Sequence, residues 1–345
     1  MSKRKVGVVG GTGYTGMELI RLLVQHSEVS LEIVTARSEA GTKYSKVYPS
    51  FEGIYDDPLR PIDDLAGMDL DLVFLALPHR VSMNFVKEYG LDSFRIIDLS
   101  GDFRLHKQAV YEEWYEKDHV CPEYLQQAAY GLPELNRDEI RNADLVANPG
   151  CYPTSAILAL APLLKQKMVE PGTIIVDAKS GVTGAGAKPK ETTHFPNLFG
   201  NFYAYGLGRH RHTPEIEQIL GGLSGNEVQI QFTPHLLPID RGILSTTYSV
   251  PNGPVSKELI RETFLGFYEK EYFVRVLDTP PSVKNVRGSN FCDLYATYDE
   301  RTNRIITISA IDNLVKGAAG QAVQNMNLMF RLIEKSGLEH SPLNP

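Results

Sequence analysis

The sequence predicts a two-domain α/β protein: an N-terminal domain with a parallel sheet, then an α+β domain with a largely antiparallel sheet. Its 345 residues are too many for one small hydrophobic core. In the first half, short apolar runs closed by turn residues alternate with segments of helical periodicity, which is typical of βαβ units. From about Thr173 onward, the apolar runs lengthen and alternate with polar residues, as in an antiparallel sheet with one solvated or helix-covered face.

Composition narrows the classes of partner. The formal net charge is −7, with 42% hydrophobic and 22% charged residues, so we expect neither a nucleic acid nor a membrane as partner. The apolar run near the N-terminus is too short for a signal peptide, and no later run approaches the ~18 residues of a membrane span. Three widely spaced cysteines, Cys121, Cys151 and Cys292, predict reduced thiols in a cytoplasmic protein without a metal site.

The elements of the first domain follow in order. Lys5–Val9 is a short apolar run before glycines and predicts a buried strand. Tyr14–His26 places Met17, Ile20 and Leu23 on one helical face. Further strands are predicted at residues 31–36, 71–77, 95–99 and 144–147.

The second domain begins after these strands. A helix is predicted at 154–166 behind Pro153, with a kink or early stop at Pro162. Alternating strands are predicted at 227–233, 242–250, 291–298 and 304–311, and a final amphipathic helix at 317–335 packs back onto one of the sheets. We therefore expect residues 1–148 plus 314–345 to form the first domain and 149–313 the second.

A glycine loop lies between the first predicted strand and helix. The spacing Gly10-x-x-Gly13-x-x-Gly16 permits a sharp turn and close backbone approach to a pyrophosphate, which the helix N-terminus attracts. This placement predicts a Rossmann-type dinucleotide-binding domain, although a tight structural turn is the alternative. The cofactor-binding residues expected here are Gly10, Thr12, Gly13, Tyr14, Thr15 and Gly16.

The end of the second strand indicates which dinucleotide binds. NAD sites usually carry a carboxylate about 20 residues after the glycines, to hold the ribose 2′-hydroxyl. Here Arg37 and Ser38 occupy that position, which suits the 2′-phosphate of NADP, although Glu39 follows closely. The alternative for Arg37 is a solvated loop arginine.

Cys151 lies in the segment NPGCYPT, at the start of a predicted helix. The positive end of a helix dipole favours the thiolate form of cysteine, so Cys151 is a candidate nucleophile. The alternative is a buried, inert thiol.

A nucleophilic thiolate needs a proton-transfer partner, and the segment GRHRHTPEI offers one. His210 and His212 alternate with Arg209 and Arg211, and Thr213-Pro214-Glu215 predicts the cap and first turn of a helix. We expect a basic strip that binds an anionic substrate beside a general base. A metal-binding histidine pair and a solvated surface strip are the alternatives.

Six motifs together carry a resemblance to a known family. GGTGYTG, DLSGDFRL, NPGCYPT, SGVTGAG, GRHRHTPEI and NLVKGAAGQAVQ occur in this order over nearly the whole chain. They resemble those of the N-acetyl-γ-glutamyl-phosphate reductases, the arginine-biosynthesis members of the semialdehyde dehydrogenase superfamily. The resemblance implies NADPH-dependent reduction of N-acetyl-γ-glutamyl phosphate to N-acetylglutamate 5-semialdehyde and phosphate, and a homo-oligomer, either a dimer or a tetramer.

The resemblance also implies roles for individual residues. Cys151 would attack the acyl phosphate and form a thioester, and His212 beside Glu215 would transfer the proton, with His210 as the alternative. Arg104 would bind the phosphate or carboxylate of the substrate, unless it forms an ion pair with Asp98 or Asp102. Further cofactor contacts would come from Pro78, Ser180, Gly181 and Asn313.

Two other functions fit the same pattern. A reductase for a carrier-bound acyl phosphate would need a broader basic rim to receive an acidic carrier protein. An NADP-sensing regulator without catalytic activity would need neither the thiol nor the histidine segment, so their presence in one chain counts against it.

Overall fold

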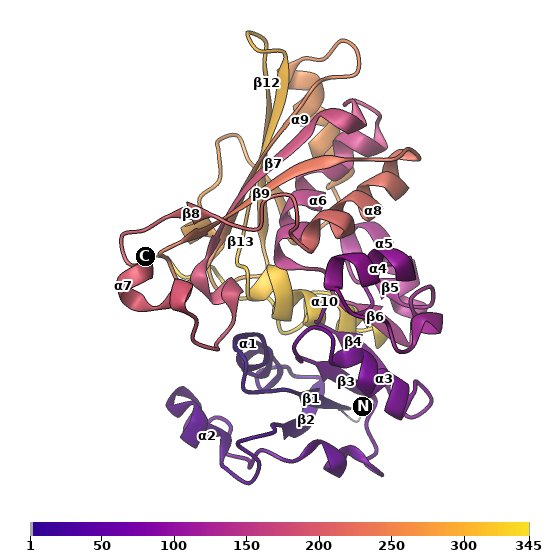
Figure 1. The fold of residues 1–345 in the computed structure, drawn as a ribbon, viewed down its shortest axis with the longest axis vertical. Helices are drawn as coiled ribbons and strands as arrows, with labels where there is room; N and C mark the ends of the chain where they lie inside the picture. The colour runs from indigo at the N-terminus through magenta and orange to yellow at the C-terminus, as the bar shows by residue number, and fades with distance from the viewer. Residues whose placement is uncertain (1–2, 345) are drawn as a thin grey trace. The chain divides into compact units, whose positions relative to one another are not determined.

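The computed structural model describes residues 3–344, which form two compact units (Figure 1). The first unit comprises residues 3–149 and Ala318–Glu339, and the second comprises Gly150–Gly317 and residues 340–344. Residues 314–317 and 340–344 thus pack with the second unit, whereas we expected them in the first domain. No helix within residues 3–344 is both long and apolar enough to cross a membrane.

The first unit contains a six-stranded parallel sheet in the order β2-β1-β3-β4-β6-β5. Its strands are β1 (Arg4–Val9), β2 (Val29–Thr35), β3 (Leu72–Leu75), β4 (Arg95–Asp98), β5 (Ala129–Tyr130) and β6 (Leu145–Ala147). All residues of β3 and β6 are buried, as expected for parallel strands covered on both faces. The predicted parallel sheet is confirmed, with the two-residue strand β5 in addition.

The order of strands creates a switch point beside β1. The chain passes from β1 to β2 on one side and then places β3 on the other side. In open sheets of this kind, ligands bind at the carboxyl ends of the strands where the order reverses. The loops after β1 and β3 therefore form the expected ligand site of this unit.

The helices of the first unit are α1 (Tyr14–Leu23), α2 (Tyr44–Val47), α3 (Ser82–Tyr89), α4 (Gln108–Tyr115), α5 (Pro133–Asn142) and α10 (Gly320–Met329). Short 3₁₀ turns lie at Pro49–Phe51, Ile62–Leu65 and Pro122–Tyr124 in this unit, and at Pro171–Thr173, Val182–Ala185, Glu191–Thr193 and Val283–Asn285 in the second.

Helix α10 differs from its prediction. We expected an amphipathic helix over 317–335, but a π-helical turn (Val315–Ala319) precedes α10, and every residue of α10 is buried. Its polar side chains are accommodated by hydrogen bonds: Asn325 Nδ2 donates to Gly131 O at 2.9 Å and to Asn148 Oδ1 at 3.0 Å. Polar side chains can be buried when they are hydrogen-bonded in this way. The polar residues of α10 therefore gave the sequence the pattern of a half-exposed helix, although the helix is buried.

The second unit contains a seven-stranded mixed sheet in the order β11-β12-β13-β10-β7-β9-β8. Its strands are β7 (Ile174–Gly181), β8 (Tyr203–Ala204), β9 (Ile230–Leu237), β10 (Ile243–Ser249), β11 (Val274–Val276), β12 (Cys292–Asp299) and β13 (Arg304–Ile311). The pairs β7–β9 and β11–β12 are parallel, and the other neighbours are antiparallel. The predicted, largely antiparallel sheet is confirmed, although β9 begins three residues later than expected.

Helices α6 (Cys151–Lys165), α7 (Phe195–Leu198), α8 (His212–Ser224) and α9 (Lys257–Phe267) complete the second unit. Helix α6 packs on β10 and β13, and it continues past Pro162 instead of stopping there. Its register on the sheet is fixed by a buried hydroxyl network. Ser155 Oγ donates to Ser245 Oγ at 2.8 Å and shares a 2.6 Å hydrogen bond with Ser309 Oγ.

Replacing Ser155 with alanine should lower the free energy of unfolding by about 1–3 kcal/mol, because two buried hydroxyls then lose a partner. Urea denaturation measures the change. Ser282→Ala, at an exposed serine, is the matched control and should stay within about 0.5 kcal/mol of the parent. Equal stability of the two variants would show that the network does not hold α6.

Candidate active site

The three cysteines lie in different environments. Cys121 and Cys292 are buried, whereas Cys151 is partly exposed. Burial raises the pKa of Cys121 to about 12, and its Sγ donates to Met83 O at 3.3 Å. Reactivity requires an accessible thiolate, so Cys151 is the candidate nucleophile among the three.

Cys151 is the first residue of α6, with Gly150 as the N-cap. Pro153 has no N–H group, and Thr154 N already donates to Gly150 O at 2.9 Å. The backbone N–H groups of Cys151 and Tyr152 belong to the first turn of the helix, where N–H groups have no intrahelical acceptor. Their partial positive charge favours an anion, either the thiolate or an oxyanion next to it.

Two further contacts fix the backbone at Cys151. Glu215 Oε1, on a side chain that is 1% exposed, accepts a hydrogen bond from Gly150 N at 2.8 Å. Gly317 approaches so closely that a Cβ there would lie 2.8 Å from Cys151 Cβ. Glu215 was predicted to assist His212, and this hydrogen bond adds a role in anchoring the cysteine helix.

The structure brings the two predicted histidines together. The rings of His210 and His212 have centroids 4.8 Å apart and lie 5.8 and 5.9 Å from the ring of Tyr152, the neighbour of Cys151. Helix α8 begins at His212 itself, one residue before the predicted cap at Thr213. Both imidazoles thus lie beside the start of the cysteine helix, within the second unit.

His210 is neutral at physiological pH. Burial, assisted by the positive charge of Arg211, lowers its pKa to about 4. Its Nδ1 accepts a hydrogen bond from His212 N at 3.2 Å, so the neutral ring carries its proton on Nε2. His210 therefore caps the N-terminus of α8. The two arginines of the segment, Arg209 and Arg211, are exposed, as a site for anions requires.

Ser180, Gly181 and Asn313 lie at the end of β7 and after β13. Asn313 Oδ1 accepts a hydrogen bond from Gly242 N at 2.8 Å, and Asn313 Nδ2 donates to Thr183 Oγ1 at 2.9 Å. A Cβ at Gly181 would lie 2.8 Å from Asp240 O, so glycine is required there. These contacts join the segments that follow β7 and β13 to the segment that precedes β10. Contact of these residues with a cofactor stays a prediction.

In the first unit, the glycine loop has the geometry of a phosphate cradle. Gly10 has φ 88°, and a Cβ on it would lie 2.7 Å from Ala76 O; a Cβ on Gly16 would lie 2.6 Å from Gly10 O. Gly13 is the N-cap of α1 and supplies no side-chain cap, so the N–H groups of Tyr14, Thr15 and Gly16 begin the helix without intrahelical partners. These features fit the pyrophosphate of a dinucleotide.

Two tyrosines that the sequence analysis missed support this loop. Tyr44 Oη donates to Gly11 O at 3.1 Å, and Tyr48 Oη donates to Thr12 O at 2.7 Å. Because each carbonyl is held on one side, the following N–H of the same peptide points to the other side. The only sequence signal was a pair of tyrosines four residues apart, which is also common in ordinary cores.

Arg37 and Ser38 follow β2 directly and are exposed. Within residues 3–344, the Arg37 guanidinium forms no ion pair or hydrogen bond. An exposed, unpaired arginine beside a hydroxyl fits a 2′-phosphate. Pro78 lies on the exposed part of the loop after β3.

Arg104 is buried in the first unit, with a side chain 4% exposed. Its Nε donates to Asn148 O at 2.7 Å, and its Nη2 donates to Leu99 O at 2.8 Å. Arg104 thus fixes the backbone three residues before Cys151 in the sequence. The predicted contact with substrate stays a prediction.

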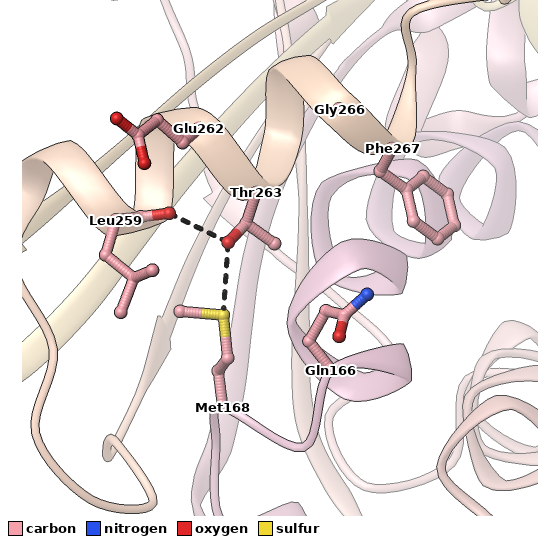
Figure 2. A pocket seen from close by; sticks show the side chains of 7 residues that line it. All are labelled: Gln166, Met168, Leu259, Glu262, Thr263, Gly266 and Phe267. Atoms are coloured by element: carbon pink, nitrogen blue, oxygen red, sulfur yellow. Dashed lines mark hydrogen bonds between the residues drawn. The ribbon is translucent and has the colours of Figure 1, made fainter.

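A surface cavity of about 420 Å³ lies elsewhere in the second unit, between α9 and the end of α6 (Figure 2). Thr263 Oγ1 donates there to Leu259 O at 2.8 Å and to Met168 Sδ at 3.5 Å. Its lining residues are Gln166, Met168, Leu259, Glu262, Thr263, Gly266 and Phe267. None of them is a predicted site residue, so this cavity lies apart from the predicted catalytic and cofactor-binding residues.

Family models match both parts of the chain. Residues 5–143 match the semialdehyde dehydrogenase NAD binding domain, and residues 151–313 match the semialdehyde dehydrogenase dimerisation domain. Among solved structures, aspartate semialdehyde dehydrogenase II of Vibrio cholerae complexed with ASA has a TM-score of 0.73 at 16% identity and covers 96% of this chain and 99% of its own. The aspartate semialdehyde dehydrogenase with NADP from Candida albicans has a TM-score of 0.70 at 16% identity, covering 97% and 99%.

Relatives with much higher identity match over the full length. The N-acetyl-gamma-glutamyl-phosphate reductases of Geotalea daltonii, Citrifermentans bemidjiense and Desulforudis audaxviator are 51%, 52% and 50% identical to this chain, and each match covers 99% of both sequences. With the cysteine, the histidine pair and the glycine loop in place, these matches show that the chain belongs to the N-acetyl-gamma-glutamyl-phosphate reductase family of semialdehyde dehydrogenases.

Proposed function

We propose that this chain catalyses the NADPH-dependent reduction of N-acetyl-γ-glutamyl phosphate to N-acetylglutamate 5-semialdehyde and phosphate, a step of arginine biosynthesis in the cytoplasm. The names of its full-length relatives support the substrate. The observation that carries the chemistry is a partly exposed cysteine at the start of a helix, with two histidines grouped around the adjacent tyrosine.

The first step is acyl transfer to Cys151. The thiolate attacks the carbonyl carbon of the acyl phosphate, a C–S bond forms, and the C–O bond to phosphate breaks, which releases phosphate and leaves a thioester. The N–H groups at the start of α6 stabilise negative charge on sulfur and on the carbonyl oxygen. The exposed Arg209 and Arg211 provide positive charge for the anionic substrate.

The second step needs a hydride, which the nicotinamide of the bound dinucleotide supplies. The glycine loop and the start of α1 would hold its pyrophosphate, and Arg37 with Ser38 would hold the 2′-phosphate that distinguishes NADP from NAD. Hydride addition to the carbonyl carbon of the thioester forms a C–H bond and leaves an oxyanion, which takes a proton from a neighbouring imidazole to give the thiohemiacetal. The same imidazole then takes this hydroxyl proton back, the C=O bond forms again, and the C–S bond breaks to restore the thiolate.

We assign the proton transfer to His212. The Nδ1 of His210 already receives the His212 backbone N–H, and its pKa of about 4 makes it a weak base at neutral pH. His212 lies equally close to the Tyr152 ring, as the first residue of α8. His210 then serves as a positioning residue that orients the segment carrying His212.

The second unit also supports self-association. Helix α6 covers one face of the sheet, while Ile175 and alternate residues of the neighbouring strands lie partly exposed on the other. The family model for residues 151–313 is described as a dimerisation domain. We propose that this open face pairs with a second copy, in a dimer or a tetramer.

Cys151→Ser should lower the rate of phosphate-dependent NADP⁺ reduction with N-acetylglutamate semialdehyde by about 10³-fold or more, because a serine hydroxyl is not ionised at the helix start. The dissociation constant for NADPH, measured by fluorescence titration, should change less than about twofold. Normal turnover of the variant would rule out the covalent mechanism. A parent protein that binds NADPH but is inactive with this substrate would refute the substrate assignment instead.

Arg37→Asp should weaken NADPH binding by about 100-fold while NADH binding changes little, because only NADPH carries the 2′-phosphate. Titration of both nucleotides measures the difference. Arg301→Asp, at another exposed arginine, is the control for the change in net charge. An equal loss for both nucleotides would contradict the NADP assignment.

The low pKa of His210 predicts that stability falls with acidification. In the unfolded chain its pKa lies near 6.5, and in the folded protein it is about 4, so between these values the unfolded state binds more protons. The free energy of unfolding should therefore decrease as pH falls from about 6.5 to about 4, and this slope should be shallower in His210→Gln. Urea midpoints at several pH values test this. His194→Gln, at an exposed histidine, should keep the parent slope.

A further inference from the structure

Arg80 has an unusual backbone conformation, with φ 71°. The other non-glycine residues with positive φ follow helices or lie in the β12–β13 turn, where left-handed residues are common. Arg80 instead lies between β3 and α3, two residues before the helix begins. A side chain in this conformation is sterically disfavoured, and such strain persists only where the surroundings impose it.

A buried carboxylate imposes the conformation. Asp102 is fully buried, and its Oδ1 accepts hydrogen bonds from Arg80 N at 2.7 Å and from Tyr111 Oη at 3.0 Å. Its Oδ2 accepts from Met83 N at 3.1 Å, in the first turn of α3, where the N-cap Val81 offers no side-chain acceptor. His79 is held as well, because its Nδ1 accepts from Gly101 N at 2.8 Å. The loop is therefore rigidly supported.

This loop adjoins the glycine loop. Strands β1 and β3 are neighbours, Ala76 N donates to Val9 O at 2.8 Å, and a Cβ on Gly10 would lie 2.7 Å from Ala76 O. The two loops thus form adjacent walls at the carboxyl ends of β1 and β3, where the strand order reverses.

The Arg80 side chain has no structural role within the described part of the chain. It is exposed, and its guanidinium forms neither a hydrogen bond nor an ion pair with any residue between 3 and 344. A strained backbone therefore presents an unpaired planar cation on the loop whose first residue, Ala76, contacts Gly10 of the glycine loop. Guanidinium groups bind phosphate oxygens through two parallel hydrogen bonds.

We propose that Arg80 is a phosphate-binding residue of this chain, which binds the pyrophosphate of the dinucleotide from the loop after β3, next to the glycine loop. The proposal rests on the dinucleotide site of the proposed function. It assigns the strain at Arg80 to ligand binding, since a glycine at this position would fit the backbone without strain but would provide no charge.

The test compares Arg80→Gly and Arg80→Lys with the control Arg331→Gly, which also replaces an arginine in the left-handed region, at φ 56°. NADPH affinity is measured directly by fluorescence titration without substrate, so failure of the substrate assignment would not affect it. For Arg80→Gly we expect a melting temperature equal to or above that of the parent, together with about tenfold weaker NADPH binding. Arg80→Lys should recover part of the affinity, and Arg331→Gly should bind as the parent does.

Salt gives a second measurement. Dissolved ions screen the attraction between an exposed cation and a phosphate. The difference in NADPH affinity between the parent and Arg80→Gly should therefore shrink between about 0.05 M and about 0.5 M KCl. Unchanged NADPH binding by Arg80→Gly would overturn the proposal. If NADPH binding is unchanged but the KM for the acyl phosphate or for inorganic phosphate rises, Arg80 binds the phosphate of the substrate, and the assignment to the nucleotide is wrong.

Discussion

The position of Cys151, and with it the proposed chemistry of the second unit, depends on how helix α6 packs on its sheet. The Ser155 hydroxyl is hydrogen-bonded to the hydroxyls of Ser245 in β10 and Ser309 in β13, and these contacts fix the register of the helix on the sheet. At the start of the helix, Glu215 holds Gly150 N, and Gly317 leaves no room for Cys151 to shift. These contacts are short and buried, so they hold the Cys151 sulfur at the N-terminus of a helix with little freedom to move.

The first unit uses a related principle. Anion binding there depends on backbone N–H groups, and their orientation is fixed by hydrogen bonds from other segments of the chain. Tyr44 and Tyr48 donate hydrogen bonds to carbonyl groups of the glycine loop. Asp102 accepts hydrogen bonds from N–H groups of the loop after β3 and the start of α3. Each supporting group is buried or partly buried, so water does not compete for its hydrogen bonds.

Much of the fold was predictable, because buried parallel strands are short apolar runs and the longer strands alternate. The turn at the glycine loop and the helix start beside Cys151 were also predictable, because each has a local geometric requirement. The two parallel pairings of the second sheet and the burial of α10 were not, since both depend on partners far away in the sequence. The same reason explains why Tyr44, Tyr48 and Asp102 were missed as supporting residues.

The burial of α10 has a consequence for synthesis of the chain. This helix belongs to the first unit, yet its residues, 320–329, are translated only after residues 150–317 of the second unit. Until then, Gly131 O and the Asn148 side chain lack their partner Asn325, and the apolar surface that α10 covers stays open to water. The N-terminal unit therefore cannot complete its core on the ribosome ahead of the rest, as a contiguous domain would. The core of this unit is complete only once residues 320–329 have been made.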